Sequence, residues 1–508
     1  MILAVPSEPF VLADHLAVLP VAIPLIACGI VAMLPSARLA WLASCIVTAV
    51  TAVLSFLLLL QVQADPDGII SYALGGWPPP IGIEYRIDIL NAFVLCIVAG
   101  VGAVIMPFAV RSVPADISTE SQPWYYATYL LCLTGLLGMT VSGDAFNIFV
   151  FMEISSLATY TMIALGRDKR ALLAAYQYLI IGTIGATFYV IGVGIIYIVT
   201  GSLNLADIAT RLGEVYATNP RPVMAAFAFL IVGISLKLAL FPLHVWLPNA
   251  YAFAPPFSTV FLAATATKVS VYVLIRIYLT LFGGTISLSQ LPVAEVLMAL
   301  ALAAMFVASL LAFYENRVER MLAYSSVAQI GYIILGIAML NTPGLTGGIV
   351  HIFNHAISKG LLFLAIGAVV YRLGHPTLTE LSGIGKKMPL TMAAFVVGGL
   401  SIIGVPGTAG FVTKWHLATG AIESGSWLLV FLIMASSVIA VLYVGRVIEV
   451  AYFRPVSKTC ERASDPGVTM TIPIAILTAA VIYFGFDTTY SSDIARDAAE
   501  MLLKGLKS

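Results

Sequence analysis

Apolar segments of about twenty or more residues recur along the whole chain and are separated by short polar stretches. Each is long enough to cross a hydrocarbon core of about 30 Å as an α-helix. The pattern predicts an all-α, polytopic membrane protein of about fourteen transmembrane helices. We expect these helices at 16–34, 38–62, 86–110, 124–141, 145–165, 171–200, 223–246, 256–282, 293–314, 322–340, 345–373, 390–422, 427–453 and 468–486, followed by an amphipathic tail over 489–506.

The composition agrees with this pattern and excludes several classes of function. Hydrophobic residues make up 60% of the chain and charged residues only 10%, which a soluble domain of this size could not keep from water. The formal net charge is zero, so no nucleic-acid partner is expected. The sequence contains no phosphate-binding loop, dinucleotide glycine fingerprint, HExxH motif or CxxC pair. We therefore expect neither a cofactor nor a metal. We expect the lipid bilayer to surround the chain.

The basic residues indicate an orientation, because Lys and Arg concentrate in cytoplasmic loops. With both termini outside, the inner loops hold the larger set: Arg38, Arg111, Arg167, Lys169, Arg170, Arg317, Arg320, Arg372, Lys386, Lys387, Arg446, Arg454, Lys458 and Arg462. The outer segments hold Arg86, Arg211, Arg221, Arg496, Lys504 and Lys507. The sequence thus predicts a multi-pass protein with both termini on the outer side of the membrane.

Two parts of the chain resemble one another. The segment 154–165 matches 324–335, and 201–208 matches 374–381. A proline-interrupted helix follows each pair, at Pro242 and at Pro406. Predicted helices 4–8 and 9–13 therefore form two five-helix repeats, inverted because each contains an odd number of helices, with helices 7 and 12 discontinuous. Chance similarity between apolar helices is the alternative.

The repeats define a division of the chain into four units. We expect N-terminal helices over 1–123, a first repeat over 124–282, a second repeat over 293–453, and a last helix with the tail over 454–508.

Two opposite charges fall within predicted helices 5 and 7. Glu153 and Lys237 would each cost several kcal/mol at membrane depth without a partner or water. Pro242 frees backbone carbonyls close to Lys237, which favours a hydrated cavity there. We predict that Glu153 pairs with Lys237, either as a switch for proton transfer or as a static link between the helices.

Further buried bases suggest a route for protons. Lys268 lies near the middle of predicted helix 8, and Lys414 follows the break of helix 12. His351, His355 and Lys359 are spaced i, i+4, i+8, which places them on one helix face. A lone buried His is often a core residue, and two His four apart can bind a metal, but Lys359 on the same face would repel a cation. We interpret the three as a proton wire. By contrast, we expect Arg276 to extend toward the membrane surface from a helix end.

At these residues the chain resembles the antiporter-like subunits shared by Mrp-type Na⁺/H⁺ antiporters, respiratory complex I and membrane-bound hydrogenases. The likeness covers roughly residues 80–455. The most specific segments are Asp144 to Glu153, Lys237-Leu-Ala-Leu-Phe-Pro-Leu-His-Val-Trp-Leu-Pro248, His351-Ile-Phe-Asn-His-Ala-Ile-Ser-Lys359 and Gly404-Val-Pro-Gly-Thr-Ala-Gly-Phe-Val-Thr-Lys414.

The resemblance implies a hydrated, charged axis at mid-membrane made of Glu153, Lys237, Lys268 and Lys414. Asp144 and His244, which lie within the resembling segments, are expected to be secondary members of the pathway. Within this family the chain looks most like the D-type Mrp protein, because Lys414 departs from those complex I subunits that carry Glu at this position and the chain ends soon after helix 14. The resemblance also implies that the chain lies in a bacterial or archaeal cell membrane, that H⁺ and Na⁺ are the transported ions, and that other hydrophobic subunits are its partners.

Three functions follow from these observations. The chain is a proton-translocating subunit of a cation/proton antiporter, a proton-pumping subunit of a complex I-like or hydrogenase-like redox complex, or a stand-alone solute carrier. A continuous charged line favours the first two, and no residue pattern suggests a catalytic redox centre within this chain.

Overall fold

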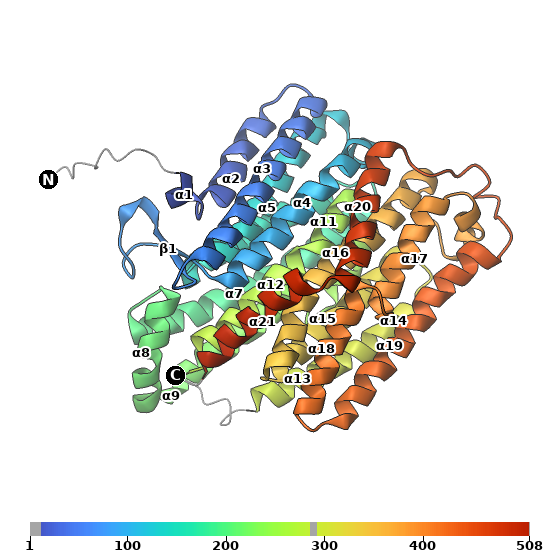
Figure 1. The fold of residues 1–508 in the computed structure, drawn as a ribbon. Helices are drawn as coiled ribbons and strands as arrows, with labels where there is room; N and C mark the ends of the chain where they lie inside the picture. Colours follow the sequence, from blue (N-terminus) through green and yellow to red (C-terminus); the bar gives the residue numbers. More distant parts are fainter. Residues whose placement is uncertain (1–11, 285–291, 507–508) are drawn as a thin grey trace.

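A computed structural model describes residues 12–284 and 292–506. Among these residues, twelve helices are long and apolar enough to cross a membrane, and one bent helix pair would make a thirteenth. A shorter apolar helix, α2, covers Leu19–Ala32. Figure 1 shows the helices packed side by side in a bundle of similarly inclined rods. The all-α, polytopic class predicted from the hydrophobic pattern is confirmed.

The first half of the bundle is built from α1 (Leu12–His15), α2, α3 (Ala37–Ala64), α4 (Ile89–Asp116), α5 (Gln122–Val141), α6 (Ala145–Ala164), α7 (Lys169–Thr200), α8 (Leu205–Thr218), α9 (Pro220–Lys237), α10 (Trp246–Phe253), α11 (Pro256–Ala264) and α12 (Ala266–Ile275). A π-helical segment, η3 (Arg276–Leu281), continues α12.

The second half contains α13 (Val293–Ala303), α14 (Ser309–Tyr314), α15 (Val318–Ala338), α16 (Thr342–Leu373), α17 (Pro389–Ile403), α18 (Ala409–Glu423), α19 (Trp427–Ile448), α20 (Val468–Phe486) and α21 (Thr489–Lys504). Helix α16 packs against α11, α15, α17, α18, α20 and α21 and so lies at the centre of this half. The short segments are η1 (Leu74–Gly76), η2 (Thr119–Ser121), η4 (Ala304–Ala308), η5 (Thr379–Leu381), η6 (Ile384–Lys386) and η7 (Glu449–Phe453).

One predicted helix start is wrong. Residues Glu84–Ile87 form strand β2, which pairs antiparallel with β1 (Ile70–Ala73), so α4 begins at Ile89 rather than at 86. Asp88 ends the strand and caps the helix by accepting hydrogen bonds from the backbone N–H groups of Leu90 and Asn91. The amphipathic α8 was also not expected.

The two discontinuous helices are present where the prolines predict them. The seventh predicted helix, 223–246, ends early: α9 stops at Lys237, residues 238–245 are not helical, and α10 follows as a separate short helix. The twelfth predicted helix divides into α17 and α18. A third break, which the sequence did not predict, separates α11 from α12 at Thr265. The inversion of the repeats and the four-unit division of the chain remain predictions, and residues 1–11 and 507–508 of those units lie outside the described residues.

The C-terminal tail forms the helix that its amphipathic pattern predicts. Helix α21 runs obliquely across the front of the bundle (red in Figure 1) and packs against α16 and α4. Its apolar face is buried through Ile494, Ala498 and Leu502, whereas its charged residues face outward.

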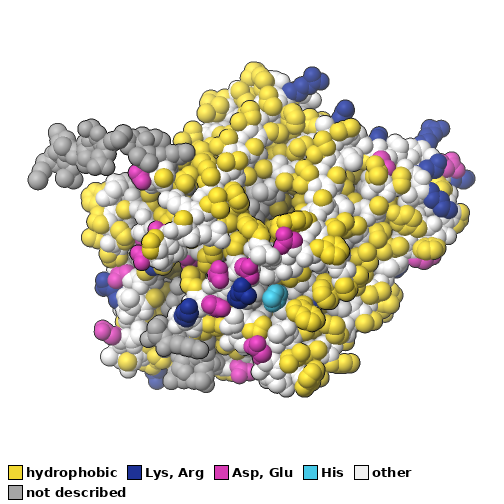
Figure 2. Space-filling view, viewed as in Figure 1, with side chains coloured by type: hydrophobic (Ala, Val, Ile, Leu, Met, Phe, Trp, Pro, Cys, Tyr) yellow, Lys and Arg dark blue, Asp and Glu magenta, His cyan; other side chains and the backbone are white. Residues whose placement is uncertain are grey.

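The surface agrees with a protein surrounded by lipid. Large hydrophobic side chains such as Ile198 and Phe431 are exposed on long helices. Figure 2 shows apolar side chains over most of one face, with Lys and Arg side chains gathered along its upper right edge. Exposed apolar area on this scale is stable only against lipid or other membrane subunits.

The orientation stays a prediction, which accessibility labelling can test. Single cysteines replacing Lys169 or Lys387 should react with an impermeant maleimide only from the cytoplasm, and one replacing Asp207 only from outside. The loop before α7 should stay at the membrane surface, because hydrogen bonds from Arg170 hold the pKa of Asp168 below its ordinary value and keep that carboxylate charged. The reverse labelling pattern would contradict the assigned orientation.

Candidate functional site

The predicted pair between helices α6 and α9 is present. The Nζ of Lys237 lies 3.2 Å from Oε1 of Glu153 and donates to the hydroxyl of Ser156 at 2.7 Å. The lysine side chain is 4% exposed and the glutamate side chain 26%. The lysine side chain is therefore buried, whereas the glutamate side chain is partly exposed. Because Lys237 is the last residue of α9, the break that follows lies directly beside this pair.

Lys268 lies at the third break in the helices. The chain leaves helical geometry at Thr265, whose hydroxyl donates to the carbonyl of Phe261 at 2.6 Å. The Nζ of Lys268 donates to the carbonyl oxygen of Ala263, near the end of α11. Carbonyls at a helix C-terminus carry partial negative charge. They hold this fully buried ammonium without a carboxylate.

The three bases of α16 lie on one helix face, as their spacing predicts. The rings of His351 and His355 stack with centroids 5.5 Å apart and planes at 11°. Nδ1 of His351 is 3.0 Å from the hydroxyl of Thr413, and Nζ of Lys359 donates to the carbonyl of Leu322 at 2.8 Å and to the hydroxyl of Ser325. Neither ring nitrogen of His355 forms a hydrogen bond with the protein within the described ranges.

Lys414 lies at the break of the twelfth predicted helix. Its Nζ donates to the carbonyls of Ile402, at 3.2 Å, and Ile403, at 2.5 Å, both at the end of α17, and to the hydroxyl of Ser437 at 2.6 Å. Gly404 has φ +85°, and a Cβ there would lie 2.5 Å from Cδ of Lys414. Only glycine allows the lysine this close approach to the helix end.

An aromatic ring joins Lys414 to the histidines. Nζ of Lys414 lies 4.9 Å from the ring centroid of Tyr332, and that ring lies 6.1 Å from the ring of His351. Lys268 and Lys359 are both within electrostatic range of His355. We call Glu153, Lys237, Lys268, His355, Lys359, His351 and Lys414 the charged line.

The two secondary residues, Asp144 and His244, contact other groups than those that hold the lysines. Asp144 caps α6 by accepting from the backbone N–H of Asn147 at 2.7 Å. His244 lies in the segment between α9 and α10, stacked on Phe241 at 5.1 Å and edge-on to Tyr324 at 6.3 Å. His244 therefore lies at the broken helix, whereas the hydrogen bonds of Asp144 serve the start of a helix.

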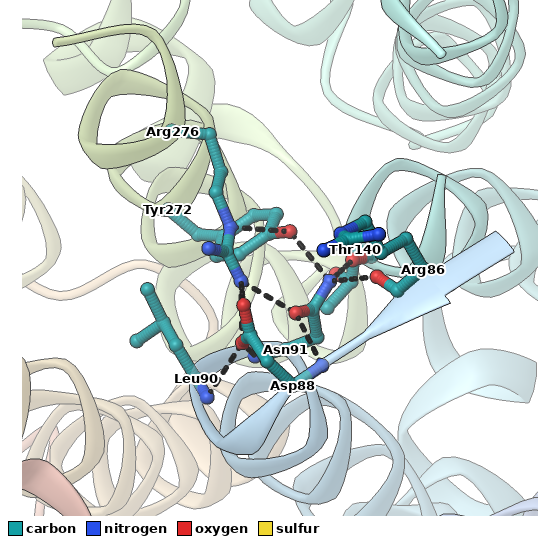
Figure 3. Close-up of polar contacts among 7 residues, drawn as sticks. All are labelled: Arg86, Asp88, Leu90, Asn91, Thr140, Tyr272 and Arg276. Carbon is teal, nitrogen blue, oxygen red and sulfur yellow. Dashed lines mark hydrogen bonds and ion pairs between the residues drawn. The ribbon is translucent and has the colours of Figure 1, made fainter. Parts of the chain in front are cut away.

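The expectation that Arg276 extends to the membrane surface is wrong. Arg276 is 8% exposed, and its Nη2 lies 2.5 and 2.6 Å from the two carboxylate oxygens of Asp88 (Figure 3). The same nitrogen donates to Oδ1 of Asn91 at 2.5 Å, and Nε donates to the hydroxyl of Tyr272 at 3.1 Å. An acidic residue directly before a long apolar helix was the available signal, because Asp88 is the cap of α4.

The described part of the chain offers no metal centre: no three His, Cys, Asp or Glu side chains cluster there in a way that could hold an ion. What the geometry contains is a set of buried basic groups at helix breaks, in a bundle with an apolar surface. This is the architecture of a membrane protein that moves small ions.

The chain belongs to the family of NADH:quinone oxidoreductase/Mrp antiporter transmembrane subunits, whose family model matches residues 142–440. It is 42% identical over 428 residues to the N-type subunit of the NADH-quinone oxidoreductase of Desulforudis audaxviator, covering 82% of this chain and 84% of that protein. It is 30% identical over 440 residues to the D-type protein of the Na⁺/H⁺ antiporter of Alkalihalophilus pseudofirmus, covering 86% and 87%.

A solved structure has the same fold over nearly the whole chain. A chain of the archaeal membrane-bound sulfane sulfur reductase complex superimposes with a TM-score of 0.88 at 32% identity, covering 97% of this chain and 99% of that one. The resemblance to an Mrp D-type antiporter-like protein is confirmed by the family match and the D-type relatives.

Proposed function

We propose that this chain is the proton-translocating membrane subunit of a multi-subunit Na⁺/H⁺ antiporter and works beside other hydrophobic subunits in a cell membrane. The observation that carries the proposal is the placement of Lys237, Lys268 and Lys414, each at a break in a helix and each buried. Buried ionisable groups are costly in a membrane and are kept where they move ions or protons. D-type antiporter relatives and multi-subunit structural neighbours support it.

The Glu153–Lys237 pair can load and release a proton. Burial disfavours the protonated form of a lysine, whereas a carboxylate at hydrogen-bonding distance favours it. Because Glu153 is partly exposed and Lys237 is not, the glutamate has more room to move. A shift of the carboxylate by a few ångströms would take away what stabilises the ammonium, and the proton would then leave toward the next base.

The remaining bases can pass protons along the charged line in either direction. Helix-end carbonyls stabilise the ammonium forms of Lys268 and Lys414 more weakly than a carboxylate would, so release from them costs less. Neutral imidazoles accept a proton on one nitrogen and release it from the other. Mobile water bridges buried polar atoms that are too far apart for direct transfer, and the ring nitrogens of His355 are such atoms.

A redox complex is the second candidate, and the comparisons give it a specific basis. The relative from Desulforudis audaxviator is part of an NADH-quinone oxidoreductase, and the structural neighbour comes from a respiratory complex. In such a complex this chain would do the same proton chemistry, driven by a catalytic arm on other subunits. Lys414 favours the antiporter over those complex I subunits that have Glu at that position.

Partner identification separates the two functions. The affinity-tagged chain, purified in mild detergent from its own cell, should bring down small hydrophobic subunits, and the purified complex should exchange Na⁺ for H⁺ in proteoliposomes. Recovery of iron–sulfur or hydrogenase-type subunits with no cation exchange would replace the antiporter with the redox complex.

Helix α16 can be tested as the central part of the path. His355→Ala should lower Na⁺-coupled proton movement in inverted vesicles by about tenfold or more, because the relay loses its middle base. The complex should still assemble, since alanine only removes a side chain that makes no protein hydrogen bond. His375→Ala, just after the end of α16 and outside the charged line, is the matched control. Normal transport by an assembled His355→Ala complex would route the protons elsewhere.

A further inference from the structure

A second buried ionic cluster lies outside the charged line, where β2, α4 and α12 meet. It contains Asp88, Asn91, Tyr272 and Arg276 (Figure 3). Asn91 donates to the hydroxyl of Tyr272 at 2.7 Å and to the carbonyl of Thr140 at 2.7 Å. Together with the bonds of Arg276, these contacts join a carboxylate, a guanidinium, an amide and a phenol in one network. A structural clamp needs only the ion pair; a phenol and an amide add groups that can accept and donate further hydrogen bonds, and the phenol can pass on a proton.

A cavity of about 230 Å³ opens beside this cluster. Its lining includes Arg86, Asp88, Ser142, Tyr272 and Arg276, and it also reaches the C-terminal segment at Leu502 and Gly505. A space of this size, bordered by charged and hydroxyl groups, suits several water molecules. It lies on the side of the bundle that carries α8 and the C-terminus, where the basic-residue pattern places the outer surface.

The cluster shares a helix with a member of the charged line. Lys268, Tyr272 and Arg276 are spaced i, i+4, i+8, so they follow one another along one side of α12. From Arg276 the helix continues as the π-helical segment η3, a distortion found frequently at functional sites. The helix thus leads from a mid-membrane lysine, through a phenol, to an ion pair at the cavity.

We propose that this cavity is the outer mouth of the proton path and that the Asp88–Arg276 ion pair is its gate. The inference rests on the proposed function. The proton leaves Nζ of Lys268, breaking an N–H bond, and passes by way of the Tyr272 hydroxyl and water to a carboxylate oxygen of Asp88, forming an O–H bond. Arg276 must turn away before Asp88 accepts, and its return expels the proton into the cavity, where water takes it. Lys268 is left neutral and ready to reload.

The test compares four variants of the intact complex in proteoliposomes, with proton flux and assembly measured together. Asp88→Asn should lower proton flux by about a hundredfold, because it removes the accepting carboxylate. Asp88→Glu should restore it in large part. Asp88→Asn combined with Arg276→Gln removes both charges, so it should assemble like the native chain while still failing to move protons. Asp207→Asn, on a partly exposed Asp–Arg pair of the same side, is the matched control and should transport normally.

Chemical labelling gives a readout that does not depend on transport. A water-soluble carbodiimide with an amine nucleophile, added on the C-terminal side, should modify Asp88, and Arg276→Gln should increase that modification severalfold. Transport at the native rate by the double variant would disprove the proposed outer mouth and make the Asp88–Arg276 pair a structural clamp. Modification of Asp88 only from the opposite side would also disprove it. Failure of the proposed function looks different, because Glu153→Gln would then transport normally.

Discussion

Replacing Glu153 with glutamine should abolish ion-coupled proton transport while leaving the complex assembled. Glutamine keeps the shape and one oxygen acceptor, but it removes the negative charge that lies 3.2 Å from the ammonium of Lys237. The lysine should then lose its proton and fail to reload, and flux in inverted vesicles should fall by about a hundredfold. Ser156→Ala removes only a neutral hydrogen bond to the same lysine and should transport at a reduced but easily measured rate.

The partner variant should give the same loss for the opposite electrostatic reason. Lys237→Ala leaves Glu153 in the membrane without its cation, so the carboxyl group should take up a proton and become inert. The double variant should retain no less residual flux than either single one, because the two residues act as one unit. Independent, multiplicative losses would mean that they do not form a functional pair, and near-normal transport by assembled Glu153→Gln would remove the switch from the mechanism.

Replacing Lys268 with arginine should also stop transport, although the positive charge is kept. Guanidinium stays protonated at any physiological pH, so arginine could occupy the helix-end site beside Ala263 but could not release a proton. We expect flux to fall by about a hundredfold in the assembled complex. Arg317→Lys, an exchange between the same two residue types at the predicted inner surface, is the control. Native flux in Lys268→Arg would show that only charge is needed at this position.

The hydrophobic pattern was sufficient to predict the all-α membrane class and most of the helices, because a run of about twenty apolar residues rarely forms anything but a membrane helix. The breaks at Pro242 and Pro406 were equally readable, since proline removes a backbone donor. The break at Thr265 was not, because the sequence has no proline or glycine there. The side chains of Thr265 and Lys268 donate to backbone carbonyls four and five residues earlier, and the hydrophobic pattern does not show such side-chain hydrogen bonds.

The candidate site shows the same limit. The pair of Glu153 with Lys237 and the shared face of His351 and His355 followed from the cost of buried charge and from helix geometry. The Asp88–Arg276 pair did not, because its two residues are far apart in the sequence and the helix predicted over 86–110 includes Asp88, which in the fold is the cap of α4. An arginine near a helix end usually reaches water. In the folded chain, Asp88, which lies between β2 and α4, pairs with Arg276, and the arginine stays buried.

The central claim is that protons cross the membrane through the lysines of the charged line, and simultaneous flux measurement tests it most directly. The purified complex is reconstituted into proteoliposomes that report internal pH, and radioactive Na⁺ is counted in the same vesicles. With Lys268→Arg in a fully assembled complex, the account predicts that proton flux and the Na⁺ flux coupled to it are both lost. Native rates of both fluxes in that variant would contradict it.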